Sequence, residues 1–139
     1  DMSEFAIQFL NSEDQPITQE TVAEVVEGIR KDRISDAWLG LDEYGEEEFL
    51  SVDLRDGWAA ICFNTYEGGN DAHMYMPVNP AYADSESNED SPVDIGGQTP
   101  IGKRNALDDL NLAADCVYHF AKTGELYPGV KWEKDSLDS

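Results

Sequence analysis

The sequence predicts a single α+β domain in which a mostly antiparallel sheet of five or six strands packs against two helices. Two stretches with helical periodicity lie near the ends of the chain, and short strand-like segments fill its middle. An Asp-Gly pair between two of these segments is typical of a hairpin. The chain has 139 residues, which suits one domain with its own core, so residues 1–139 are taken as one unit.

The N-terminal part is predicted to hold one strand and one helix. Residues 4–10 alternate loosely between apolar and polar side chains, as a strand does. Thr18 is a suitable N-cap for a helix that ends near Arg30. Apolar residues within this segment recur at the i, i+3, i+4 and i+7 spacing of one helix face: Val22, Val25, Val26 and Ile29.

A hairpin is predicted around Asp56-Gly57, between strands at 47–55 and from residue 58 onward. Both residues of a two-residue type I′ turn need positive φ, which Asp and Gly tolerate. This turn fixes a register that places apolar partners on one face, pairing Leu54 with Ala59, Val52 with Ile61 and Leu50 with Phe63. Residues 37–41 and 72–78 are predicted to extend the sheet on either side.

The C-terminal part is predicted to be a long loop, a helix and a closing strand. Residues 79–100 are polar, acidic and interrupted by prolines, with a short strand expected only at 93–95. The helix is expected over 108–122, with a C-cap at Thr123-Gly124 and an extended segment at 127–132. Its main apolar stripe is Leu110, Ala114, Val117 and Ala121. A second stripe, Leu112, Cys116 and Phe120, either widens the buried face or forms an exposed patch.

Charge is the most distinctive property of the composition. The chain has 30 acidic and 9 basic residues, a formal net charge of −21. No Lys or Arg lies between Arg33 and Arg55 or between Arg55 and Lys103. Such a field repels nucleic acid and anionic membranes and attracts basic proteins. A general solubility role, as in an acid-rich proteome, is the alternative explanation.

Membrane insertion and metal binding are not predicted. No apolar run approaches the roughly 20 residues of a membrane helix, and two cysteines in apolar segments suit a reducing compartment, so a cytoplasmic protein is expected. A calcium loop starting at Asp84 would need Gly at its sixth position and Glu at its twelfth, where the chain has Glu89 and Ile95. Cys116 and His119 have only distant further candidates, so no metal or other cofactor is expected.

No enzymatic activity is predicted either. The chain has no Gly-x-Ser-x-Gly turn, no glycine-rich phosphate loop and no His-Glu-x-x-His motif. Carboxylates are numerous, but a catalytic pair cannot be recognised from their number alone. A small acid-rich enzyme of unknown chemistry remains an alternative.

The C-terminal third resembles one family of bacterial immunity proteins. The resemblance is carried by Ala113-Ala114 to Phe120-Ala121, Lys122-Thr123-Gly124, Pro128, Val130 and Trp132, with Gly57-Trp58, Pro77 and Pro80 compatible upstream. Members of this family bind and neutralise polymorphic or contact-dependent toxins, frequently deaminase-like or nuclease toxins. The matched residues are expected to be structural, with Phe120 and Trp132 in the core. The resemblance therefore implies a scaffold and leaves its contact surface open.

The charge and the resemblance predict the same partner, a cognate basic toxin. A toxin that acts on nucleic acid carries a basic cleft for phosphate, which an acidic inhibitor can fill. The expected contacts are the acidic loops and nearby tyrosines, with Tyr66 as a further anchor: Asp42, Glu43, Glu46, Glu67, Asp71, Tyr75, Tyr82, Asp84, Glu86, Glu89, Asp90 and Asp94. A nucleic-acid mimic that inhibits a DNA-binding protein is the main alternative function.

Overall fold

A computed structural model of the chain describes residues 5–11, 15–42, 47–67, 71–86 and 89–134. In chain order its elements are β1 (Phe9–Leu10), α1 (Gln19–Arg30), β2 (Asp36–Gly40), β3 (Phe49–Arg55), β4 (Trp58–Glu67), β5 (Asp71–Pro77), η1 (Pro80–Tyr82), β6 (Asp90–Ile95), β7 (Thr99–Gly102), η2 (Lys103–Asn105), α2 (Leu110–Thr123) and β8 (Trp132–Lys134).

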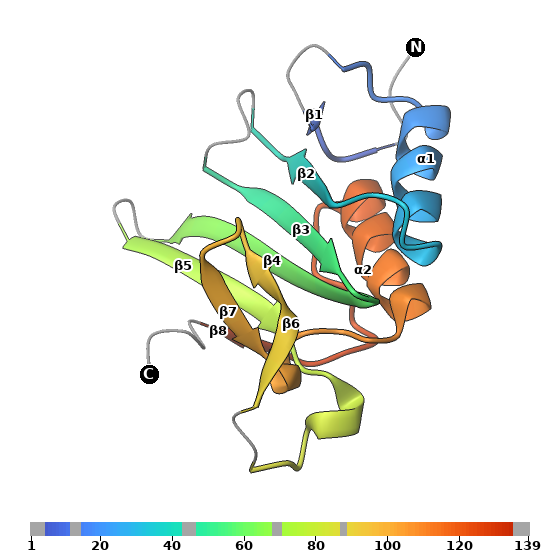
Figure 1. Ribbon diagram of the computed structural model, residues 1–139. Helices are drawn as coiled ribbons and strands as arrows, with labels where there is room; N and C mark the ends of the chain where they lie inside the picture. The colour runs from blue at the N-terminus through green and yellow to red at the C-terminus, as the bar shows by residue number, and fades with distance from the viewer. Residues whose placement is uncertain (1–4, 12–14, 43–46, 68–70, 87–88, 135–139) are drawn as a thin grey trace.

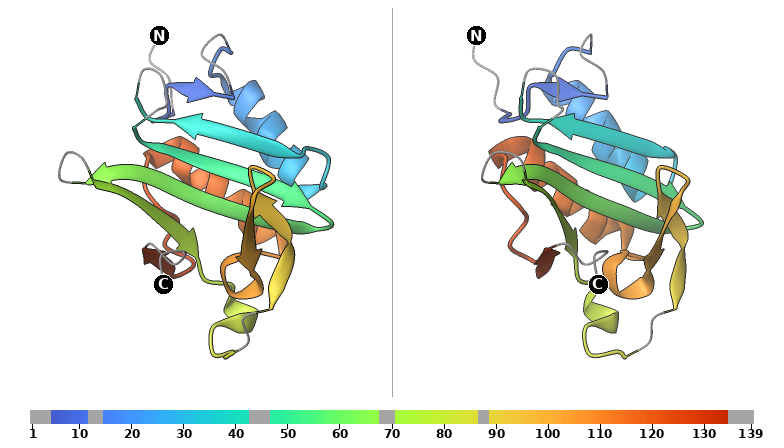
Figure 2. Two further views of the ribbon diagram at one scale, coloured as in Figure 1. Left: turned by 60° about the vertical axis from the view of Figure 1, so that its left-hand side comes forward. Right: turned by 90° about the vertical axis from the view of Figure 1, so that its left-hand side faces the viewer.

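The fold has three layers. A six-stranded antiparallel sheet in the order β1-β2-β3-β4-β5-β8 forms the middle layer, and both α-helices lie on one of its faces (Figure 1). The two-stranded sheet of β6 and β7 lies across part of the opposite face (Figure 2). The predicted α+β class is thereby confirmed.

Local sequence signals explain both helices. The Thr18 side chain accepts a hydrogen bond from the Thr21 backbone N–H, and the Thr21 hydroxyl accepts one from the Thr18 backbone N–H, which closes a capping box at the start of α1. Asp109 caps α2 by accepting from the backbone of Asn111 and Leu112. Gly124 ends α2 in the left-handed conformation at φ 75°, as its sequence predicts.

The Asp56-Gly57 turn sets the centre of the sheet. Asp56 has φ 52° and Gly57 has φ 82°, the positive values that a type I′ turn requires. The predicted register is confirmed, with Leu54 opposite Ala59, Val52 opposite Ile61 and Leu50 opposite Phe63. These strands therefore turn one apolar face toward the helices.

Two apolar clusters hold the layers together. The larger lies between sheet and helices, and its most deeply buried large side chains include Leu39, Leu50, Ile61 and Phe120. The smaller lies between the sheet and the β6–β7 hairpin and consists of Ala60, Cys62, Met76, Val93, Ile101 and Ala106. In the second stripe of α2, Cys116 and Phe120 are buried and Leu112 is half-buried, so this stripe widens the buried face.

Three segments differ from the sequence-based expectation. Residues 79–100 are not one long loop, because they contain η1, the whole of β6 and the start of β7. The first strand covers only Phe9–Leu10, since the Ala6 N–H donates to Ala121 at the end of α2 and so departs from the sheet. The last strand begins at Trp132, later than predicted, and pairs with β5.

No helix in the described part of the chain is both long and apolar enough to cross a membrane.

Candidate functional site

A groove lies on the sheet face opposite the helices. It has a volume of about 320 Å³ and is formed by β2, β3, the end of β4 and the tip of the β6–β7 hairpin. We call it the sheet groove, and it is lined by Asp36, Ala37, Trp38, Phe49, Ser51, Val52, Asp53, Asn64, Ile95 and Gly96. None of these ten residues is basic.

Strand alternation places the polar and aromatic side chains in the sheet groove. In β3, Leu50, Val52 and Leu54 face the helices, so the side chains between them face the groove. Asp36 on β2 is the direct cross-strand partner of Asp53 on β3. Two carboxylates are therefore placed on the same face at adjacent positions.

An aromatic pair forms one side of the groove. The ring centroids of Trp38 and Phe49 are 5.9 Å apart, with their planes inclined at 48°. Both side chains are half-buried, and Phe49 lies opposite Gly40, which has no side chain to cover it. The pair thus presents aromatic surface beside the two carboxylates.

The hairpin tip completes the groove and lies near one of its carboxylates. Gly96 and Gly97 have φ 61° and 76°, a conformation that favours glycine and makes a tight turn possible after β6. The backbone of Gly96 lies beside the Asp53 carboxyl and lowers its pKa. The segment that follows Ile95 therefore lines the groove together with the middle of the sheet.

The electrostatic environment disfavours the charged form of Asp53. Burial raises the pKa of this carboxyl above its usual value of 3.8, and the negative charges of Asp36 and Asp94 raise it further. The polar backbone of Gly96 acts in the opposite direction and lowers the pKa. Repulsion among the three carboxylates is thus built into the free protein.

The chemistry of the groove fits recognition of a cation. Carboxylates attract positive charge, and aromatic faces bind ammonium or guanidinium groups. Within the described ranges, no group of three His, Cys, Asp or Glu side chains is placed to hold a metal ion. Cys62, the cross-strand partner of Ser51, is buried, and burial followed by the charge of Asp53 raises the pKa of its thiol to about 12. It is therefore a poor nucleophile at neutral pH.

The predicted acidic contacts separate into distinct places. The chain leaves β2 and β4, and enters β3 and β5, at the same end of the sheet, because neighbouring strands are antiparallel (Figure 1). Asp42 follows β2 and accepts hydrogen bonds from the Glu47 and Glu48 backbone. Glu67 and Asp71 are cross-strand partners at the end of β4 and the start of β5. Glu43 and Glu46 lie outside the described residues.

The remaining acidic residues follow β5, which runs to the other end of the sheet (Figure 1). Asp84, Glu86 and Asp90 are exposed there. Glu89 is also exposed and forms an ion pair with Lys103, with a carboxylate oxygen 3.1 Å from Nζ. Asp94 does not join this group, since β6 carries it to the sheet groove near Asp53.

The three tyrosines predicted as anchors also have different environments. Tyr66 is 51% exposed, so its ring is accessible to a partner. Tyr75 is half-buried, with its ring centroid 6.1 Å from that of Phe63 on the helix side of the sheet. Tyr82 is half-buried at 6.2 Å from Trp58. Of the predicted anchors, Tyr66 therefore offers the most accessible surface.

Sequence reasoning missed the sheet groove. Asp36 and Asp53 were noticeable only as members of a base-free run, and nothing local predicts that they are partners. The available signal was alternation, because a carboxylate at the centre of an apolar strand must face away from the core. Trp38 and Phe49 could be assigned to the groove only once the β2–β3 register was known.

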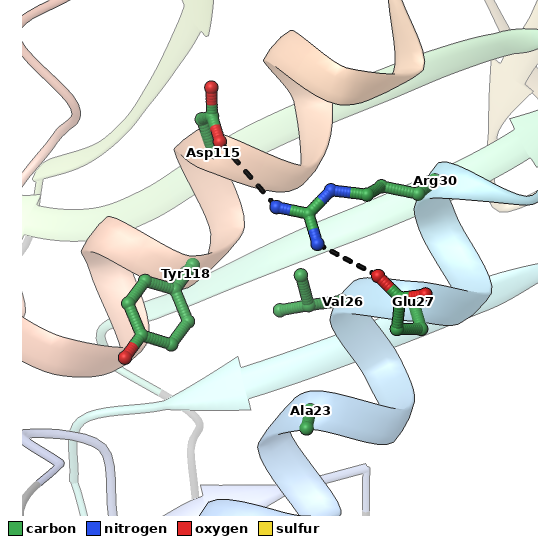
Figure 3. Close-up of a pocket in the computed structure, with 6 residues that line it drawn as sticks. All are labelled: Ala23, Val26, Glu27, Arg30, Asp115 and Tyr118. Atoms are coloured by element: carbon green, nitrogen blue, oxygen red, sulfur yellow. Dashed lines mark hydrogen bonds and ion pairs between the residues drawn. The ribbon is translucent and has the colours of Figure 1, made fainter.

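A second cavity, of about 270 Å³, lies between α1 and α2 (Figure 3). There the Arg30 guanidinium lies between two carboxylates, 2.8 Å from Glu27 and 3.8 Å from Asp115. The cavity is also lined by Ala23, Val26 and Tyr118. Its charged groups are paired with each other across the two helices, which indicates a structural role.

Comparisons with models of protein families, with curated proteins and with solved structures find no match. Inferences about function therefore come from the residues and geometry of this chain.

Proposed function

We propose that this protein is an immunity protein that binds a basic bacterial toxin, one that acts on nucleic acid, and occludes its active-site cleft. The observation that carries the proposal is the distribution of charge along the chain. Residues 34–102 contain 15 acidic residues and a single basic one, Arg55. This segment includes β2 to β7, which form the centre of the main sheet and the whole hairpin on its helix-free side.

The basic residues lie elsewhere, and several are already engaged by carboxylates. Arg30 pairs with Glu27 and Asp115 at the helix layer. Arg104 pairs with Glu133 at 2.7 Å, beside β8. Excess negative charge is thus concentrated in the strands and turns of residues 34–102, to which a positively charged protein surface would be attracted.

A toxin that acts on nucleic acid is the kind of partner that this field fits. Its substrate site must attract phosphate and is therefore positively charged. An inhibitor with complementary charge associates quickly and excludes wrong partners. A nucleic acid would be repelled by the same field, which supports a protein as the partner.

The residues that carry the resemblance to immunity proteins have structural roles in this chain. Phe120 is buried, Gly124 caps α2, and Trp132 is half-buried, with its indole N–H donating to the Tyr127 carbonyl at 2.8 Å. The resembling segment therefore supports the identity of the scaffold, while the charge distribution supports the location of the contact surface.

Co-expression with the protein encoded by the adjacent gene tests the proposal. We expect a stable complex of the two proteins and complete loss of the partner's activity on nucleic acid at equimolar ratio. A partner that retains its activity in the presence of excess inhibitor would overturn the proposal. Capture of a chromosomal DNA-binding protein, with no binding to the adjacent gene product, would favour the nucleic-acid mimic instead.

A further inference from the structure

We propose that the sheet groove is the docking site for one arginine side chain of the basic partner. This inference rests on the proposed function, because it assigns a position and a chemistry to part of the same interface. The groove is lined by the tip of the β6–β7 hairpin and by the Trp38–Phe49 pair. It lies on the sheet face that the hairpin crosses, opposite the helices (Figure 2).

The dimensions and lining of the groove suit a single long side chain. Its volume of about 320 Å³ is at the lower end of the range of ligand sites. A guanidinium group is planar, so it can stack on an aromatic ring while its N–H groups donate to carboxylates. The groove offers both kinds of contact, with Trp38 and Phe49 on β2 and β3 and Asp53 beside them.

The arrangement of carboxylates favours occupation by a cation. Asp36 and Asp53 are direct cross-strand partners, and like charges in that relationship repel each other. Asp94 adds a third negative charge near Asp53. A bound guanidinium would relieve this repulsion, so part of the binding free energy comes from removing an unfavourable feature of the free protein.

Charge complementarity also decides between possible occupants. A second copy of the chain would bring another formal charge of −21, and nucleic acid would bring phosphates. Lysine can supply the positive charge, but its ammonium is a point charge with no plane to stack on the rings. Arginine is thus the occupant that uses both the carboxylates and the aromatic pair.

A titration with a short arginine peptide tests the assignment directly. Isotope-labelled full-length protein would be titrated with acetyl-Gly-Arg-Gly-amide, and with matched peptides that carry lysine or citrulline in place of arginine. We expect NMR shifts concentrated at the Trp38 indole N–H and the backbone N–H groups of Gly96 and Asn64. They should be largest for arginine and absent for uncharged citrulline.

Two matched variants separate the groove from general charge attraction. Asp53→Asn keeps the shape of the side chain but removes its charge. It should weaken arginine binding about tenfold, since a charge-assisted hydrogen bond is lost. Glu24→Gln removes one exposed charge from α1, on the other side of the sheet, and should leave binding nearly unchanged. The melting temperature of Asp53→Asn controls for loss of structure.

Shifts that are equal for arginine and lysine and spread over all acidic surfaces would overturn the inference. Arginine binding that is unaffected by Asp53→Asn would do the same. If Asp53→Asn also inhibits the toxin with unchanged affinity, the groove is not part of the interface, although the proposed function stands. Specific arginine binding without any binding of the adjacent gene product would support the groove assignment and overturn the toxin as its partner.

Discussion

The carboxylates of Asp36 and Asp53 lie on the same face of the sheet, because the two residues are direct cross-strand partners in the β2–β3 ladder. Opposite charges are the stabilising choice at such positions, and like charges are destabilising. Local rules of this kind are most often broken at functional sites, where another requirement outweighs stability. We therefore regard this pair as the centre of the candidate site.

Asp53→Asn should make the free protein more stable at neutral pH. The substitution removes the repulsion from Asp36 and Asp94 and the cost of burying a charge, while it keeps the shape of the side chain. We expect a gain of about 0.5 kcal/mol in the free energy of unfolding, the scale of cross-strand pair energies. Thermal or denaturant unfolding of both proteins would measure it.

The stability gained by Asp53→Asn should depend on pH. Because the folded-state pKa of Asp53 is raised above 3.8, its destabilising effect grows as pH rises above 3.8 and reaches its full size above the folded pKa. The penalty is lost as pH falls, so the two unfolding curves should converge near pH 3.8. A variant that is less stable than the parent at neutral pH would show that Asp53 has a structural role.

The backbone of Gly57 should be essential for the central hairpin. Apart from the two neighbouring residues, no atom lies within 4 Å of a Cβ built at this position, so φ 82° decides the cost. Gly57→Val should destabilise the fold by about 1–3 kcal/mol. Gly57→Asn is the matched control and should cost less, because Asn tolerates positive φ. Equal stability of the two variants would contradict the type I′ assignment.

Phe120 should contribute more to the core than Trp132. Phe120 is 1% exposed and its ring centroid is 5.5 Å from that of Phe63, so Phe120→Ala should cost about 3–5 kcal/mol. Trp132 is half-buried beside β5, so Trp132→Ala should cost less than about 3 kcal/mol. Unfolding curves of both variants measure the two losses in stability. A larger loss for Trp132→Ala than for Phe120→Ala would contradict the prediction.

Both thiols should be unreactive in the native protein. Burial raises the pKa of the Cys62 and Cys116 thiols to about 12, helped at Cys62 by Asp53 and at Cys116 by Asp115. Since the thiolate is the reactive form, we expect negligible labelling by a thiol reagent at mildly alkaline pH. Both cysteines should react once the chain is unfolded. Fast labelling of the folded protein would mean that these side chains are accessible.

Much of the fold was predictable because its signals are local. Apolar periodicity and caps indicate α1 and α2, and the Asp56-Gly57 turn fixes the register of β3 and β4. The fold class follows from these elements together. The positions of Asp84, Glu86 and Asp90 on the surface were also foreseeable, since they belong to a polar segment.

The β6–β7 hairpin and the sheet groove were not predictable in the same way. Pro92 and Pro100 argue against strands, yet both are exposed on a small two-stranded sheet with no central position to disturb. The buried side chains of the hairpin are Ser91, Val93 and Ile101. Only two of them are apolar, too few to produce a recognisable strand alternation in the sequence. The groove depends on contacts between β2, β3 and this hairpin, which are distant in sequence.

The acidic segment after β5 should act mainly on the rate of association with the partner. One variant would convert Asp84, Glu86, Glu89 and Asp90 to the corresponding amides. A control would convert four exposed acidic residues outside the proposed surface: Glu20, Glu24, Asp32 and Glu125. We expect the first variant to associate more slowly and with a flatter salt dependence, while its dissociation changes little, as for charges at an interface rim. Equal effects of the two variants would contradict a local role.

The most direct test of the central claim is the association rate with the adjacent gene product, measured by stopped-flow at low and at physiological salt. The claim is that a concentrated acidic surface attracts a basic partner. We expect fast association that slows steeply as salt is added, because mobile ions screen long-range attraction. An association rate that is the same at both salt concentrations, or the absence of any complex, would contradict it.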